Sequence, residues 1–191
     1  MLPPPQSGAA AAAFSPCGRY RWWLQRSWDP SRPALVFVGL NPSRADARRD
    51  DPTLRRLVAY ARSWGFGGLE VVNLFARVAA KAVMLRRLED PVGCCNDDWI
   101  RRCLERQPAV TVWLGWGNGG AWRGRDRQVL ALLAEQGVGP VALAVTAAGH
   151  PRHPLYCPAA MTLGPFASSW GDRVDPAPSP CPVRYAASPS T

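Results

Sequence analysis

Three short apolar runs, each followed closely by or containing a polar residue, dominate the hydrophobic pattern of the chain. They span residues 35–39, 69–74 and 141–145. Asn41 follows the first run, Asn73 lies in the second, and His150 and His153 follow the third. Buried parallel strands read as nearly continuous apolar runs, and ligands bind at the carboxyl edge of such sheets. The pattern therefore predicts three strand ends that meet at one site.

The segments between these runs favour helices. Pro52 suits a first helical turn with Asp51 as its N-cap, and apolar residues then recur at helical spacing up to Ala61. Further helices are expected from Asn96, as an N-cap, and over 126–135. A fourth strand is expected over 109–115, and an edge strand or extended arm over 19–26. Alternating strands and helices predict an α/β fold, a three-layer α/β/α arrangement around a central, mainly parallel four-stranded sheet.

Composition indicates one domain over residues 19–167. The segment 1–18 is rich in Pro and Ala and is expected to be disordered, and 168–191 is expected to be a flexible tail. We find no apolar run of roughly 18 residues and no basic leader, so a cytoplasmic protein without a membrane partner is expected. The six cysteines should then be reduced. They form no Cys-x-x-Cys pair, so neither a metal cluster nor a structural zinc is expected. No cofactor is expected, and a monomer is favoured.

The formal net charge of +9 comes almost entirely from arginine, and Lys81 is the only lysine. Arginine binds phosphate through paired hydrogen bonds, so DNA is a reasonable partner. A genome rich in Arg, Ala and Pro codons would produce the same charge without a nucleic acid, and solvated surface arginines are an equally good interpretation. The candidate nucleic-acid contacts are Arg44, Arg48, Arg55, Arg123 and Arg152.

Five motifs in order carry a family resemblance: Gly39-Leu-Asn-Pro-Ser, Asp51-Pro-Thr, Val72-Asn-Leu-Phe-Ala, Pro91-Val-Gly and His153-Pro-Leu-Tyr. Together they resemble a bacterial family catalogued as domain of unknown function 1643, over about Tyr20 to Phe166. The family label implies no activity. The motifs and the Gly-Trp-Gly loop supply the candidate substrate-binding residues Gly39, Leu40, Pro42, Ser43, Asp51, Asn73, Phe75, Trp116, Pro154 and Tyr156.

A more distant resemblance implies a chemistry. Gly39-Leu-Asn-Pro is similar to the first motif of the uracil-DNA glycosylase superfamily, and His150-Pro-Arg-His-Pro-Leu is similar to its His-Pro-Ser-Pro-Leu loop. The resemblance implies a metal-independent hydrolase that cleaves the N-glycosidic bond of an extruded base. Asn41 would hold the attacking water, and Asn73 would contact the base edge. Either His150 or His153 would stabilise the leaving base, and the sequence does not choose between them.

Other interpretations of these residues remain open. Asn41 could be a turn residue that bonds its own backbone, and Asp51 could serve only as a helix cap. Mismatch-type glycosylases carry an aromatic residue after the first motif, whereas this chain has Thr53-Leu-Arg-Arg-Leu there. Two further functions are therefore considered: a non-catalytic DNA-binding or base-sensing module, and a hydrolase of small nucleosides or nucleotides.

Overall fold

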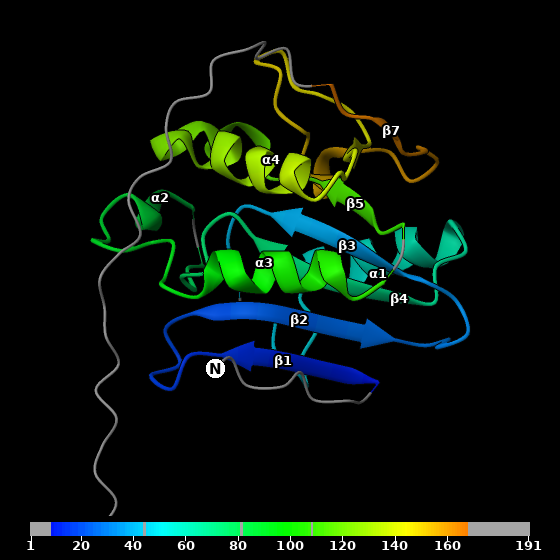
Figure 1. The fold of residues 1–191 in the computed structure, drawn as a ribbon, viewed down its shortest axis with the longest axis horizontal. Helices are drawn as coiled ribbons and strands as arrows, with labels where there is room; N and C mark the ends of the chain where they lie inside the picture. The colour runs from blue at the N-terminus through cyan, green and yellow to red at the C-terminus, as the bar shows by residue number, and fades with distance from the viewer. Residues whose placement is uncertain (1–8, 44, 81, 108, 168–191) are drawn as a thin grey trace, which may run out of the picture.

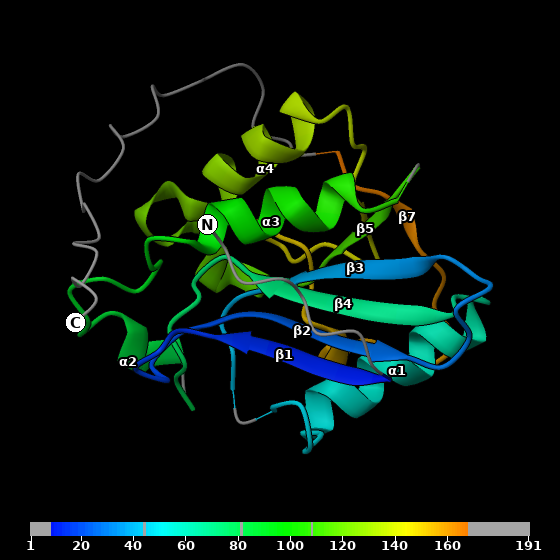
Figure 2. The ribbon, with the colours of Figure 1, turned by 60° about the horizontal axis from the view of Figure 1, so that its bottom comes forward.

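The computed structural model describes residues 9–43, 45–80, 82–107 and 109–167. Within them the backbone forms one seven-stranded sheet in the order β1-β2-β4-β3-β5-β6-β7 (Figures 1 and 2). The strands are β1 Ala10–Phe14, β2 Arg21–Ser27, β3 Ala34–Gly39, β4 Gly68–Asn73, β5 Thr111–Leu114, β6 Val141–Ala142 and β7 Gly164–Pro165.

The middle of the sheet is parallel, and its borders are antiparallel. Strands β4, β3, β5 and β6 run parallel, whereas β1, β2 and β7 pair antiparallel. The α/β class is confirmed, but the expected count of four strands was wrong. The four expected runs form the parallel centre, and three antiparallel strands extend it. Because β1 is a run of alanines and β7 has two residues, neither carries an alternation signal.

The segment expected to be disordered is therefore partly a strand. Residues 10–14 pair along β2, and the side chain of Ala11 is buried. This pairing also places β2 inside the sheet rather than at its edge. The hydrogen bonds to β2 and the burial of Ala11 stabilise a segment whose own propensity for strand is low. Residues 1–8 and the expected tail, 168–191, lie outside the described residues.

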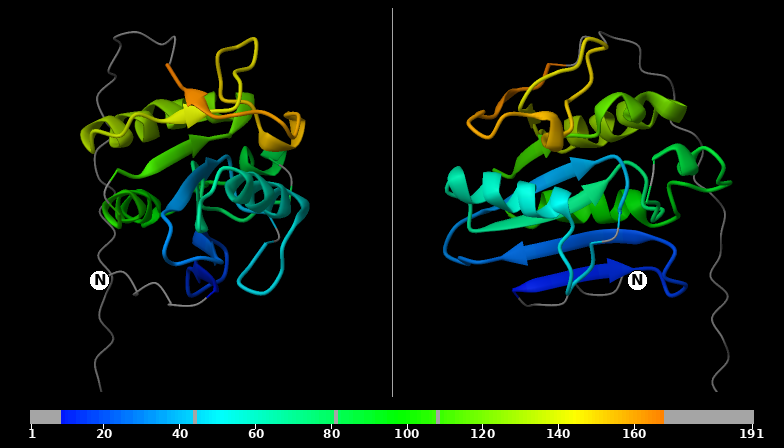
Figure 3. Two further views of the ribbon diagram at one scale, coloured as in Figure 1. Left: turned by 90° about the vertical axis from the view of Figure 1, so that its right-hand side faces the viewer. Right: turned by 180° about the vertical axis from the view of Figure 1, so that it is seen from behind.

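Helices pack on both faces of the sheet (Figure 3). Helix α1 (Pro52–Ser63) covers one face, and α3 (Asn96–Glu105) and α4 (Arg125–Glu135) cover the other. Short pieces complete the fold: α2 (Ala82–Leu85) and the 3₁₀ helices η1 (Gly117–Gly124) and η2 (Pro154–Tyr156). None of the helices in the described ranges has the length and apolar character needed to cross a membrane.

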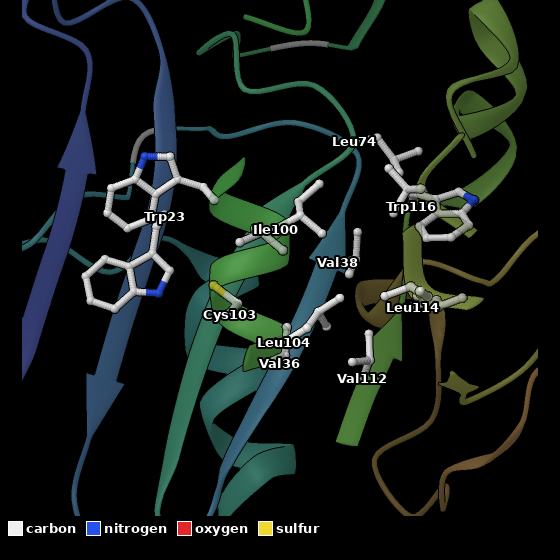
Figure 4. Packing of buried hydrophobic residues seen from close by; sticks show 14 of the residues in the cluster. Trp23, Val36, Val38, Leu74, Ile100, Cys103, Leu104, Val112, Leu114 and Trp116 are labelled. Atoms are coloured by element: carbon white, nitrogen blue, oxygen red, sulfur yellow. The ribbon is translucent and has the colours of Figure 1, made fainter. Parts of the chain in front are cut away.

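Alternation along β3 separates two hydrophobic clusters. Val36 and Val38 point toward α3 and α4 (Figure 4). On that side of the sheet, Trp99 stacks on Trp23. Leu35 and Phe37 point toward α1, into a cluster that also holds Leu24, Leu57, Leu69 and Trp113. Successive strand residues face opposite sides of a sheet, so one strand feeds both layers. Phe37 consequently faces the side of the sheet on which α1 lies.

Asn96 was expected to be the N-cap of α3, but it is not. Cys95 holds the N-cap position, and Asn96 is the first helical residue, with no exposed surface. Its amide nitrogen donates to the carbonyl oxygens of Asn73 and Leu74, at 2.9 and 3.0 Å. In an apolar neighbourhood such hydrogen bonds are stronger than those of a helix cap exposed to water. Asn96 thus fastens the end of β4, which carries the next residue of interest, Asn73.

Candidate functional site

A cavity of about 160 Å³ opens at the carboxyl ends of β3 and β4, beside the first turn of α1. An engineered protein cavity of about 150 Å³ takes up one benzene molecule, so this volume suits a ligand with one six-membered ring. The lining residues are Arg21, Leu24, Phe37, Gly39, Leu40, Asn41, Ser43, Ala45, Asp51, Thr53, Leu54, Leu57, Val71, Asn73, Ala79, Ala80 and His153. Seven of the residues singled out from the sequence line this one space: Gly39, Leu40, Asn41, Ser43, Asp51, Asn73 and His153.

Asn41 is fixed by its own amide. Its Nδ2 atom donates to the carbonyl oxygens of Pro42 and Ala79, both at 2.9 Å. The bond to the adjacent residue fits the turn interpretation, and the second bond fastens the loop that carries Ala79. With Nδ2 occupied, Oδ1 is the atom of the side chain that can accept a hydrogen bond from a water or ligand in the cavity.

Asn73 presents a buried donor without an acceptor. Its side chain is 3% exposed, and no described residue accepts a hydrogen bond from Nδ2. Gly39 lies beside it on β3, and a β-carbon there would lie 2.9 Å from Asn73 Oδ1. An unpaired buried amide donor costs about 1–3 kcal/mol. A ligand acceptor in the cavity would remove that cost.

Arg21 was not singled out from the sequence. It begins β2, is 4% exposed, and donates from Nη1 to the carbonyl oxygen of Ala45 at 2.7 Å. Its Nε atom has no acceptor among the described residues. Burial lowers the pKa of Arg21 to about 10, although the carboxylate of Asp51 acts in the opposite direction. The guanidinium therefore stays charged at neutral pH. In the sequence, the one feature that could have drawn attention to Arg21 is its place directly before three apolar residues.

Asp51 serves both as a helix cap and as part of the cavity wall. Its Oδ1 accepts from the backbone N–H of Leu54 at 2.7 Å, which confirms the predicted cap of α1. Its Oδ2 accepts the hydroxyl of Ser43. A carboxylate has about four acceptor positions, so two bonds leave capacity for a water in the cavity.

The two histidines occupy different environments. His153 lines the cavity, and its Nδ1 accepts from the backbone N–H of Leu155 at 3.3 Å. Burial lowers the pKa of His153, while Asp51 raises it. A neutral ring that accepts at Nδ1 carries its proton on Nε2, so His153 is a donor there. His150 is buried elsewhere, with Nδ1 3.5 Å from Oδ2 of Asp126 on α4.

Several expected contacts lie outside the cavity lining. Trp116 is 2% exposed and packs against Phe166, because the loop after β5 turns it into the core rather than outward. Phe75 is buried against Trp122. Three further candidates are His150, Pro42 and Pro154, all buried and absent from the lining. Tyr156 is the last residue of η2, three residues after His153, and it is 74% exposed.

An aromatic residue does line the cavity, but from an unexpected element. Phe37 of β3 contributes it, and its ring meets Trp113 edge-on at 4.9 Å between centroids. The start of α1 carries no aromatic residue, as the sequence shows. Strand parity places Phe37 on the same side of the sheet as α1, so it gives the cavity an aromatic wall.

Four of the five arginines named as nucleic-acid contacts are exposed: Arg48, Arg55, Arg123 and Arg152. Arg123 also packs on Trp122 and donates to the carbonyl oxygen of Glu89. Arg44 lies outside the described residues. Arg48, Arg55 and Arg152 belong to segments that also contribute cavity residues. Within the described part of the chain, no three His, Cys, Asp or Glu side chains converge as a metal site would require.

Comparison with known proteins places the chain in a family. No curated protein and no solved structure matches it. The family model described as "Protein of unknown function (DUF1643)" matches residues 21–155. This range begins at Arg21 and includes every residue that lines the cavity. The protein is therefore a member of the DUF1643 family.

Proposed function

We propose that this protein hydrolyses the N-glycosidic bond of a nucleobase extruded from DNA, without a metal ion. The observation that supports this proposal most is the meeting of Asn41, Asn73 and His153 at one cavity with room for a single ring. A fixed acceptor, a buried donor and a neutral imidazole are groups that such a hydrolysis can use.

In the proposed reaction, water attacks the sugar carbon of the glycosidic bond. The bond to the base breaks, and its electron pair leaves on the base nitrogen. Asn41 Oδ1 orients the water, because its amide nitrogen is already held by two carbonyls. Asn41 is neutral and a poor base, so the carboxylate of Asp51 takes the proton of the water. Asn73 Nδ2 and His153 donate to the departing base.

The surroundings of the cavity support a polymer as substrate. Arg48, Arg55 and Arg152 are exposed on segments that also line the cavity. Leu155 and Tyr156, next to His153, are 45% and 74% exposed. Cationic side chains contact phosphates, and exposed apolar side chains can wedge into a base stack. A hydrolase of free nucleosides would need neither feature.

The test is single-turnover formation of abasic sites on oligonucleotides that each carry one deaminated or damaged base. We expect turnover on at least one substrate and a loss of about 10²-fold or more in Asn41→Ala. Asn118→Ala is the matched control, since Asn118 is exposed and bonds only Thr146 among the described residues. Circular dichroism and denaturation establish that both variants are folded.

Three outcomes would contradict the proposal in different ways. Turnover that survives in Asn41→Ala would remove Asn41 from the reaction. Tight, salt-sensitive binding without turnover on any base would instead indicate a base-sensing module. Hydrolysis of free nucleosides, with no effect of added salt, would indicate a small-molecule hydrolase.

A further inference from the structure

We propose that Arg21 and Asn73 together bind the base as an anion, with Arg21 as the cationic donor that stabilises the leaving group. This inference rests on the proposed function, and it assigns a role to a residue that no motif identified. It also states the chemical class of ligand that the cavity selects: a single-ring heterocycle that is negatively charged when bound.

The first observation concerns unpaired polar atoms. Eight buried side-chain nitrogen or oxygen atoms of the described residues have no hydrogen-bond partner. Two of them belong to residues that line the cavity, Arg21 Nε and Asn73 Nδ2. Both are donors. Buried polar groups are nearly always paired, so a ligand that reaches these two atoms would have to present acceptor atoms to them.

The second observation concerns charge. Arg21 is 4% exposed, yet none of the ion pairs recorded among the described residues includes it. Its direct partner is a neutral carbonyl oxygen, that of Ala45. The two oxygens of Asp51 already accept from Ser43 and Leu54. The carboxylates of Asp51 and Asp46 act on Arg21 without forming an ion pair with it. An anionic ligand would supply the direct counter-charge that this buried cation lacks.

The third observation links this charge to the reaction. When the glycosidic bond breaks, the base nitrogen keeps the electron pair, so the base becomes an anion. His153 is another donor at the cavity, and burial lowers its pKa, which favours the neutral ring. Arg21 remains protonated at neutral pH, so it stabilises negative charge without transferring a proton. Differential stabilisation of the departing anion is what accelerates bond cleavage.

Binding of free bases tests the inference without requiring turnover. Uracil and 6-azauracil have nearly the same size, but at mildly alkaline pH 6-azauracil is largely an anion and uracil is neutral. We expect the native protein to bind 6-azauracil about tenfold more tightly, since hydrogen bonds between charged groups are stronger. Isothermal titration calorimetry, supported by thermal shift, measures both affinities.

Variants then show which residue causes the preference for the anionic base. Arg21→Met should bind both bases with equal affinity, whereas Asn73→Ala should weaken both and keep the preference for the anion. Arg101→Met on α3 is the matched control, because Arg101 lies on the opposite face of the sheet and bonds Asp98. If Arg21→Met does not fold, Arg21→Lys keeps the charge but not the geometry, and it should retain part of the preference.

The outcomes separate this inference from the proposed hydrolysis. Equal affinity of the native protein for the two bases would overturn the inference, even if abasic sites form. An anion preference that persists in folded Arg21→Met would overturn the assignment to Arg21. A preference that depends on Arg21, found in a protein without glycosidase activity, would uphold the binding role and reject only the reaction.

Discussion

The side-chain oxygen of Asn73 lies 2.9 Å from the position that a β-carbon on Gly39 would take. The two residues are paired neighbours on β4 and β3, at the ends of their strands. The absence of a side chain at Gly39 is what lets the Asn73 amide lie over the end of β3. The close packing involves the oxygen of the amide, and the nitrogen is the atom that lacks a hydrogen-bond partner.

Gly39→Ala should disturb both the packing and the site. The added methyl group would also lie 3.1 Å from Cε1 of Phe37, so two cavity side chains would have to move. We expect the free energy of unfolding to fall by about 1–3 kcal/mol, measured by urea denaturation, and base binding to be lost. Gly139→Ala, with open space around the added carbon, is the control. Full base binding by Gly39→Ala would show that the Asn73 orientation does not matter.

Asn73→Leu should uncouple stability from binding. Leucine has a similar size but no polar atom, so it removes the buried N–H that lacks an acceptor. We expect the free energy of unfolding to stay level or rise by about 1 kcal/mol, while calorimetry detects no base binding. A loss of several kcal/mol would mean that Asn73 is satisfied within the folded chain.

Variants of Asp51 can separate its two roles. Asp51→Ala removes the acceptor for Leu54 N–H and should cost about 1 kcal/mol in denaturation experiments. Asp51→Asn keeps an oxygen for the cap but removes the carboxylate. It should restore stability and still lower single-turnover rates by about 10²-fold or more. A stable, fully active Asp51→Asn would restrict Asp51 to capping.

Because of His153, the free energy of unfolding should fall as the pH is lowered. Burial lowers its pKa in the folded protein, and the unfolded chain protonates at the ordinary imidazole value, about 6.5. The folded state therefore binds fewer protons, so its stability is complete above that value. Stability is then lost as the pH falls through the lower folded pKa. Denaturation curves across this range should show a smaller decline for His153→Gln, and identical declines would contradict the assignment.

Cys17 should be the most reactive thiol of the described cysteines. Its sulfur lies 3.4 Å from Nε of Arg19 and 3.3 Å from Oγ of Ser15, and these contacts lower its pKa to about 6. Burial raises the pKa of Cys103. Iodoacetamide at neutral pH should label Cys17 first by mass spectrometry, and Arg19→Gln should slow this labelling about tenfold. Equal rates in the two proteins would refute the role of Arg19.

The amino-acid pattern predicted the parallel centre of the sheet and the first helix well. Long apolar runs and the Asp51-Pro52 cap are local signals, and their physical basis lies within a few residues. It failed for β1, whose alanines have little strand propensity of their own. It also failed for Asn96, because a buried side chain bonded to β4 looks like a helix cap when the neighbouring strand is unknown.

Some residues of the candidate site could be identified from the sequence, and others only from the structure. Asn41, Asn73 and Asp51 were identifiable from sequence because polar residues at strand ends and before Pro52 are distinctive. Only the tertiary structure showed that Arg21, Phe37 and His153 line the cavity and that His150 does not. Strand order sets which residues face the cavity, and strand order depends on hydrogen bonds between segments far apart in the chain. Local sequence thus determined which groups end each strand, and long-range pairing decided which of them share one cavity.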